Sequence, residues 1–184
     1  VKERLEDWLS YESGEKAFLF YYNSDWSTLI GYPAGHGQDN NINDHHFHWG
    51  YFIHAASFLQ QFDPDWVDEW GPMINFLIRD AASTNRSDEK FPFLRNFSPY
   101  AGHSWANGFA SFPQGNDQES TSESMQFNSS LIHWGTITSQ DEILKKLKHP
   151  SSDRIFRIYD AFRIGVPIQR IHAIPNIDFW FFRR

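Results

Sequence analysis

The chain has 184 residues, enough for one domain with a hydrophobic core, and it carries a formal net charge of −7 at pH 7. This acidic balance argues against a nucleic-acid-binding protein, which needs a basic face. The absence of cysteine excludes disulfides, cysteine catalysis and cysteine-ligated zinc, and no apolar run is long enough to span a membrane.

The N-terminal part of the chain is predicted to form a short helix, an extended hairpin and a loop. An apolar stripe at helical spacing indicates a helix over residues 1–10. Residues 16–33 are rich in aromatic and β-branched side chains, and a turn signal at 23–25 divides them into two extended segments. The polar, glycine-containing segment 34–44 is typical of a loop.

Three later segments carry apolar residues at helical spacing. The stripes run over residues 49–59, 66–81 and 127–134, and an Asp-Pro pair ends the first of them. Trp134 lies on the third stripe and is expected in the core. We therefore expect antiparallel helices joined by long loops.

A shorter fourth helix and a long loop complete the predicted elements. Ser139 and Glu142 have the spacing of a capping box, so a separate helix is expected over residues 141–148, closed by Pro150. Residues 83–116 form a long loop-rich stretch, and loops of that length are usually functional or disordered. Their aromatic and arginine content argues against disorder.

Aromatic side chains make up 18% of the chain. They could simply form an aromatic-rich core. They could also line a cleft on which sugar rings stack, because tryptophan and tyrosine join an apolar ring to a polar tip. Composition leaves both interpretations open.

One acid and three histidines lie together directly before a predicted helix, in the stretch NNINDHHFHWGY. Asp44 could cap the helix by accepting hydrogen bonds from the backbone of its first turn. Asp44, His45, His46 and His48 could instead bind a metal ion, although their spacing matches no common zinc motif. A third interpretation makes Asp44 a catalytic carboxyl group that neighbouring polar groups orient.

The stretch GHSWA, residues 102–106, approximates the nucleophile elbow of serine hydrolases, with Ser104 as the nucleophile. An elbow follows a buried strand, whereas the preceding FLRNFSPY contains proline and arginine and makes a poor central strand. His103 and Trp105 are better explained as residues that line a polar pocket or pack a loop against the helices.

Two glutamates lie four residues apart in the stretch GNDQESTSE. Ser120 and Glu123 have the spacing of a capping box, which leaves Glu119 outside the helix. If the helix starts one turn earlier, the Cβ atoms of Glu119 and Glu123 lie about 5–6 Å apart on the inward face. Repulsion between the two carboxylates would then keep one of them protonated near neutral pH. The spacing leaves both interpretations open.

Four segments, taken in order and approximate spacing, resemble glycoside hydrolase family 81, a family of endo-β-1,3-glucanases: NDHHFHWGYFIHAAS, LIRDAAS, FPFLRNFSPYAGHSWANG and GNDQESTSESMQF. The resemblance runs from about Lys16 to about Lys148. It implies a mainly α fold that is part of an (α/α)6 barrel, with a short extended hairpin near the N-terminus. Residues 1–149 would be a fragment of this catalytic domain, and residues 150–184 a divergent C-terminal segment.

The resemblance also implies a mechanism, the inverting hydrolysis of internal β-1,3-glucosidic bonds. Asp44 matches the family's general acid, Glu119 its proposed general base and Glu123 a second essential glutamate. An inverting pair of carboxyl groups stands roughly 6.5–9.5 Å apart, to leave room for the attacking water. Positions that resemble substrate-cleft residues are His48, Tyr51, His103 and Trp105, and the rings expected to stack on glucose are those of Trp49 and Trp105.

No metal and no organic cofactor is implied, and β-1,3-glucan of the laminarin type is the expected partner, with neither nucleic acid nor a membrane. An extracellular or cell-wall location follows from the same resemblance. Two other classes of function stay open. The same cleft could bind β-glucan without turnover, or the chain could be an unrelated helical interaction domain in which Glu119 and Glu123 are surface caps.

Overall fold

The structure is a computed structural model, and it divides into two compact units, Val1–His133 and Trp134–Arg184. Among the residues it describes, no helix is both long and apolar enough to cross a lipid bilayer. The described residues are 1–10, 17–108, 113, 115–148 and 154–174, and side chains are described for all of these except 140–148 and 154–156.

The first unit begins with the predicted short helix and hairpin. Helix α1 spans Lys2–Leu9, strand β1 spans Leu19–Asn23 and strand β2 spans Thr28–Tyr32. The strands are antiparallel and the turn between them occupies residues 24–27. The ring of Trp8 packs against those of Phe18, Phe20 and Phe52 at centroid distances of 5.1–5.5 Å, which fastens α1 and the hairpin to the next helix.

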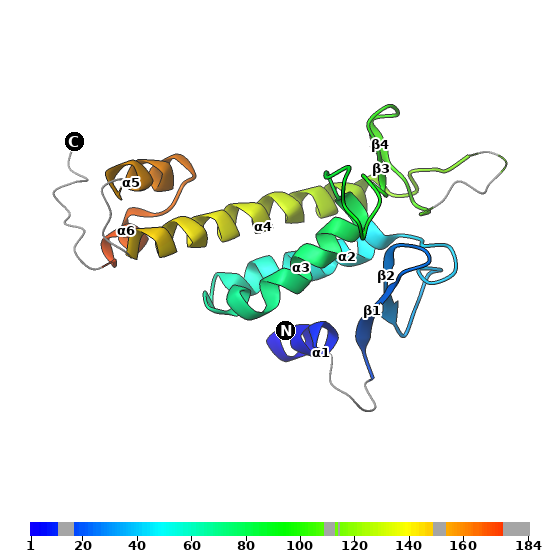
Figure 1. Ribbon diagram of the computed structural model, residues 1–184, viewed down its shortest axis with the longest axis horizontal. Coiled ribbons are helices and arrows are strands. Elements are labelled where there is room, and N and C mark those ends of the chain that lie inside the picture. The colour runs from blue at the N-terminus through cyan, green and yellow to red at the C-terminus, as the bar shows by residue number, and fades with distance from the viewer. Residues whose placement is uncertain (11–16, 109–112, 114, 149–153, 175–184) are drawn as a thin grey trace. The chain divides into compact units, whose positions relative to one another are not determined.

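Helices α2, His45–Gln60, and α3, Trp66–Ala82, lie side by side and form the centre of this unit (Figure 1). They are antiparallel, because the start of α2 contacts the end of α3. Their facing sides bury Ile53, Ile74 and Leu77 completely. Both helices agree with the apolar stripes in the sequence.

The long loop after α3 has a defined backbone in its described part. It contains a two-residue antiparallel ladder of β3, Phe97–Ser98, and β4, His103–Ser104. Backbone hydrogen bonds fasten the loop to both central helices: Asn96 N donates to Ala81 O at the end of α3, and Asp44 N, just before α2, donates to Ala106 O. The expected loop is therefore part of the scaffold around the start of α2.

Helix α4 spans Thr121–Lys148 without a break, so the separate helix expected over residues 141–148 is wrong. Neither proline nor any other strong helix breaker interrupts the helix near Ser139, and a capping-box pattern has no effect where the backbone before it is already helical. Trp134 is buried as expected. Close to its start, α4 approaches α2 at Gly50, where an added Cβ would lie 3.2 Å from the Cα of Phe127.

The second unit contains two short helices, α5, Arg154–Arg163, and α6, Ile168–His172. Gly165, with a positive φ of 79°, ends α5, and the amide of Val166 donates back to the carbonyl of Ala161. The helices share a small apolar core of their own, formed by Ala161, Val166, Ile171 and Ile174. No helix was predicted within residues 150–184.

Candidate active site

Asp44 occupies the N-cap position of α2 but does not cap the helix, so the capping interpretation is wrong. Its backbone has a positive φ of 57°, and its side chain makes no hydrogen bond to the first turn. Its Oδ2 instead accepts a 2.7 Å hydrogen bond from Asn43 Nδ2, while its buried Oδ1 has no hydrogen-bond partner among the residues that the structure describes. Asp44 is only 8% exposed, so its carboxyl group is poorly solvated.

Glu119 lies in the loop directly before α4, also with a positive φ of 59°. Ser120 Oγ accepts a 3.3 Å hydrogen bond from the amide of Glu123, and the helix begins at Thr121. The capping interpretation therefore describes the local backbone, and the earlier helix start is wrong. Glu123 does not complete the box, because its Oε1 accepts a 3.0 Å hydrogen bond from the hydroxyl of Tyr51 on α2.

Asp44, Glu119 and Glu123 nevertheless form one carboxyl cluster. Burial, the charge of Glu119, a side-chain hydrogen bond with Glu119 and the charge of Glu123 together raise the pKa of Asp44 to about 7, against a smaller opposing effect of His45. A hydrogen bond between two carboxyl groups requires that one of them is protonated. Asp44 is the one whose surroundings favour the proton.

Asp44 and Glu119 lie near each other, because the charge and the side chain of Glu119 add to burial in raising the pKa of Asp44. Inverting enzymes keep their two carboxyl groups roughly 6.5–9.5 Å apart, because a water molecule must stand between the base and the sugar.

Aromatic and histidine side chains surround the cluster. Tyr51 is exposed, and its hydrogen bond to Glu123 is the main cause of its raised pKa. The half-buried ring of His48 lies 5.5 Å from that of His36. Burial, followed by the charges of His36 and His45, lowers the pKa of His48 against the opposing charge of Glu123.

His103 and Trp105, both half-buried, pack edge to face at a centroid distance of 4.9 Å. His103 Nδ1 bonds to the carbonyl of Ser104, and the Ser104 hydroxyl pairs with that of Ser124, so no histidine activates Ser104. A loop rather than a helix follows β4. The serine-hydrolase interpretation is therefore wrong.

Trp49 lies in the core, which corrects its expected role as a sugar-stacking residue. It is 1% exposed, and its Nε1 donates a 2.7 Å hydrogen bond to Asp80 Oδ2. His45 and His46 are also buried. Throughout the described part of the chain, no three histidine or acidic side chains are grouped so that they could hold a metal ion.

Asp80 on α3 is the important residue that sequence analysis missed. It is fully buried and accepts hydrogen bonds from Thr28 Oγ1 at 3.0 Å, Leu29 N at 3.1 Å and His45 Nδ1 at 2.7 Å, besides Trp49. Burial alone would raise its pKa, but the charge of His45, its hydrogen bond and Arg95 lower it. An acid on the apolar stripe of a predicted helix was the available signal, because such an acid needs buried partners.

His45 connects this buried network to the catalytic candidate. Its Nε2 faces the carbonyl of Gln38 at 2.9 Å, and a carbonyl can only accept. Its Nδ1 lies 2.7 Å from Asp80 Oδ2, so both ring nitrogens face oxygen acceptors. Asp80 thereby fixes the position of the imidazole in the residue next to Asp44.

Comparison with known proteins extends these observations. Residues 1–149 match the model of the glycosyl hydrolase family 81 C-terminal domain, and residues 119–184 match that of the carbamoyl-phosphate synthetase large chain oligomerisation domain. A 50-residue part, 26% of the chain, is 48% identical to the carbamoyl phosphate synthase large chain of Rhodopirellula baltica, of which it covers 5%.

Two curated relatives are named glucan endo-1,3-beta-D-glucosidase. That of Acetivibrio thermocellus is 52% identical over 145 residues, which are 78% of this chain and 19% of the relative. That of Thermobifida fusca is 47% identical over 175 residues, which are 90% of this chain and 23% of the relative. This chain thus spans about a fifth of the length of these relatives.

A solved structure of a family 81 glycoside hydrolase from Clostridium thermocellum is similar over 97% of this chain, with a TM-score of 0.72 and 43% identity, and the match covers 23% of that protein. The mainly helical fold agrees with this likeness. Because the family model matches residues 1–149, well over half of the sequence, the chain belongs to glycoside hydrolase family 81.

Proposed function

We propose that this chain carries the acid and base of an endo-β-1,3-glucanase, which hydrolyses internal bonds of β-1,3-glucan with inversion. The observation that carries the proposal is the contact between Asp44 and Glu119, two carboxyl groups 75 positions apart in the sequence. Environments that push the pKa values of neighbouring carboxyl groups apart distinguish an acid from a base. The names of the two curated relatives support the substrate class.

Asp44 acts as the general acid. With a pKa raised to about 7, a large fraction of it is protonated at neutral pH and can donate to the leaving glycosidic oxygen. Glu119 acts as the general base and takes a proton from the attacking water. Glu123, held by the Tyr51 hydroxyl, orients that water or tunes Glu119.

The bound substrate must leave room for a water molecule between the two carboxyl groups. Asp44 is held by its backbone bond to Ala106 and by Asn43. Glu119 lies on an exposed loop before α4. We therefore propose that Glu119, rather than Asp44, adjusts its position so that the pair takes up the roughly 6.5–9.5 Å separation of inverting enzymes.

Residues around the cluster are proposed to bind the glucan. Tyr51, His48, His103 and Trp105 remain candidates because each is exposed or half-buried, whereas Trp49 is not. We propose that residues 1–149 form part of an (α/α)6 barrel. An extracellular or cell-wall location would give such a chain access to polymeric glucan.

The test is incubation with laminarin, comparing the unmodified chain with Asp44→Asn and Glu119→Gln. The unmodified chain should release α-configured products, seen by proton NMR before mutarotation, and each substitution should lower the rate at least about 100-fold. Asp65→Asn, an exposed acid at the start of α3 that makes no capping hydrogen bond, is the matched control and should keep full activity. Release of β-configured products, or full activity of the Glu119 variant, would contradict the mechanism.

A glucan-binding module without turnover is the second candidate, favoured by the exposed ring of Tyr51 and the half-buried ring of Trp105, which could hold a sugar without chemistry. It predicts that all three proteins bind insoluble β-1,3-glucan equally and release no sugar.

We also propose that residues 150–184, which sequence analysis set apart as divergent, mediate association between copies of the chain. Support comes from the oligomerisation-domain model that matches residues 119–184. The small core shared by α5 and α6 shows that this segment has packing of its own.

A further inference from the structure

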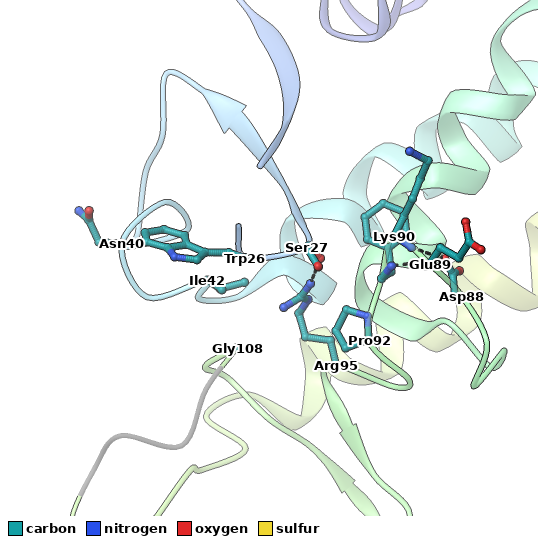
Figure 2. A pocket seen from close by; sticks show the side chains of 11 residues that line it. Trp26, Ser27, Asn40, Ile42, Asp88, Glu89, Lys90, Pro92, Arg95 and Gly108 are labelled. Atoms are coloured by element: carbon teal, nitrogen blue, oxygen red, sulfur yellow. Dashed lines mark hydrogen bonds between the residues drawn. The ribbon is translucent and has the colours of Figure 1, made fainter. Parts of the chain in front are cut away.

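A pocket of about 690 Å³ lies beside the segment that carries Asp44 (Figure 2). Its size is typical of sites that bind small ligands. Four stretches line it: the turn of the hairpin with Trp26, the loop before α2 with Asn40 and Ile42, the loop after α3 over residues 88–95, and Gly108 further along that loop. None of the functional assignments above uses it.

Trp26 offers a flat aromatic surface on one side of this pocket, and Pro92 and Arg95 lie on the other (Figure 2). Its side chain is 48% exposed although it is large and apolar. The turn that carries it is held by Asn23, whose Oδ1 accepts hydrogen bonds from the amides of Asp25 at 3.0 Å and Trp26 at 3.1 Å. The ring therefore stands on a fixed backbone.

The opposite wall is also rigid. Asp88 accepts hydrogen bonds from both Arg79 Nε and Nη2, at 2.9 and 2.8 Å, and from the amides of Lys90 and Phe91. Arg95 donates to the carbonyl of Ser27 across the pocket floor. A wall fixed by so many bonds loses little conformational entropy when a ligand binds.

The charges of the lining favour a neutral ligand. Two acidic residues, Asp88 and Glu89, balance two basic residues, Lys90 and Arg95. Asp88 is paired with Arg79, and Arg95 contacts the buried Asp80, so neither is free to bind a charged group. Exposed polar groups beside an apolar ring suit a hydroxyl-rich sugar, whose faces stack on tryptophan while its edges form hydrogen bonds.

The pocket adjoins the carboxyl cluster through the backbone. Ile42 lies two residues before Asp44, and two residues of extended chain span at most about 7 Å. Gly108 closes against Ile42 so tightly that a Cβ added there would lie 2.4 Å from the Cβ of Ile42. The wall of the pocket at Ile42 is therefore close along the backbone to the residue that carries the buried carboxyl group.

We propose that this pocket binds a glucosyl segment of the β-1,3-glucan chain, with Trp26 as its stacking surface. The proposal deepens the proposed function and rests on it for the identity of the polymer. The pocket adds affinity for long chains and sets their position relative to Asp44 and Glu119.

The experiment uses the full chain labelled with 5-fluorotryptophan, in the Glu119→Gln background so that turnover is suppressed. Fluorine NMR resolves individual tryptophans, and the Trp26→Phe variant assigns the signal of residue 26. A β-1,3-linked glucose hexamer should shift that signal saturably, and inorganic phosphate should not. Trp26→Ala should weaken hexamer binding about tenfold, the effect of losing one aromatic contact. Phe62→Ala, an exposed aromatic residue outside the pocket, should bind unchanged.

An unmoved Trp26 signal, or equal hexamer affinity of Trp26→Ala and its parent, overturns the proposal, even if the unmodified chain hydrolyses laminarin. A shift caused by phosphate rather than the hexamer overturns it as well. If the Trp26 signal responds while the unmodified chain releases no sugar, the pocket stands and the hydrolase function fails.

Discussion

Asp44 is an acid whose surroundings oppose its ionisation in three ways. Its side chain is almost fully buried, its Oδ1 lacks a donor among the described residues and Glu119 places a second carboxyl group near it. His45 acts in the other direction, since its positive charge lowers the pKa of Asp44. The balance, a pKa of about 7, is suited to an acid that must be protonated at neutral pH and still release its proton to the substrate.

The pH profile of hydrolysis should report this balance. Activity requires protonated Asp44, so kcat/KM on laminarin should fall above about pH 7 as Asp44 loses its proton. The Glu123→Gln variant removes one of the charges that raise this pKa, so its falling limb should shift to lower pH. Initial rates measured from pH 4 to 9 give the falling limb of the unmodified chain and that of the variant. An unshifted limb in the variant would show that another group controls it.

Stability should depend on pH through the same group. The pKa of Asp44 is about 7 in the folded chain and 3.8 without the fold, so the folded state holds the proton more tightly. The stabilisation that the folded state gains by holding this proton is complete below pH 4 and is lost as the pH rises through 7. Asp44→Asn, which never ionises, should therefore match the unmodified chain at pH 4 and exceed it at pH 8, by about 1–3 kcal/mol, or several degrees in Tm. Thermal unfolding at the two pH values measures the difference, and an equal gain at both would contradict the explanation.

At the scale of the elements, the close approach of α2 and α4 at Gly50 sets the distance between Tyr51 and Glu123. A Cβ on Gly50 would lie 2.7 Å from Gln126 Oε1 and 3.2 Å from the Cα of Phe127. The side chain can turn aside, but the backbone of α4 cannot move without displacing Glu123. The glycine therefore has a positional role in the candidate site.

Gly50→Ala should destabilise the chain by about 1–3 kcal/mol, the usual penalty for overpacking, and should weaken hydrolysis because Glu123 moves away from Tyr51. Gly135→Ala is the matched control in the same α4, since its added Cβ would meet nothing within 4 Å. That control should gain up to about 1 kcal/mol through helix propensity. Urea denaturation measures both changes, and equal stabilities for the two variants would refute the packing argument.

The elements that the sequence predicts well are those whose signal is local. The stripes that became α2 and α3 recur every three or four residues, so their period alone identified them. Ser139 shows the limit of short motifs, because a four-residue pattern does not reveal that the backbone around it is already helical. Trp49 shows another limit. Its partner Asp80 lies 31 positions away, so the residues around Trp49 in the sequence could not predict that its side chain is buried.

The sequence proposes members for the candidate site but does not predict its geometry. Asp44 and Glu119 were named through family resemblance, whereas their contact depends on the loop that the Asp44–Ala106 backbone bond fastens to the start of α2. Non-local pairing of this kind has no periodic signature. For the same reason, the ion pair of His45 and Asp80 could be recognised only after folding.

At the scale of the whole molecule, two family models meet in one chain: the glucanase model covers residues 1–149 and the oligomerisation-domain model residues 119–184. They overlap along α4. The chain therefore combines a candidate catalytic unit with a segment that is proposed to bind other copies of the chain. Self-association would then present two or more glucan sites to one polymer, which raises the apparent affinity for insoluble glucan through multivalency.

The self-association should depend on the exposed face of α5. Tyr159 is 64% exposed, and large exposed aromatic residues are frequent anchors of interfaces. Sedimentation equilibrium should show a concentration-dependent oligomer for the unmodified chain. Tyr159→Glu should weaken that association at least about tenfold, because it places like charges at the contact between copies. Gln169→Glu, which adds the same charge at an exposed position on α6, tests whether charge alone is responsible. If the unmodified chain is a monomer at every concentration, the role proposed for residues 150–184 is refuted. Equal weakening of the association by both variants would show that Tyr159 is not at the contact. Selective weakening by Tyr159→Glu would locate the contact on α5.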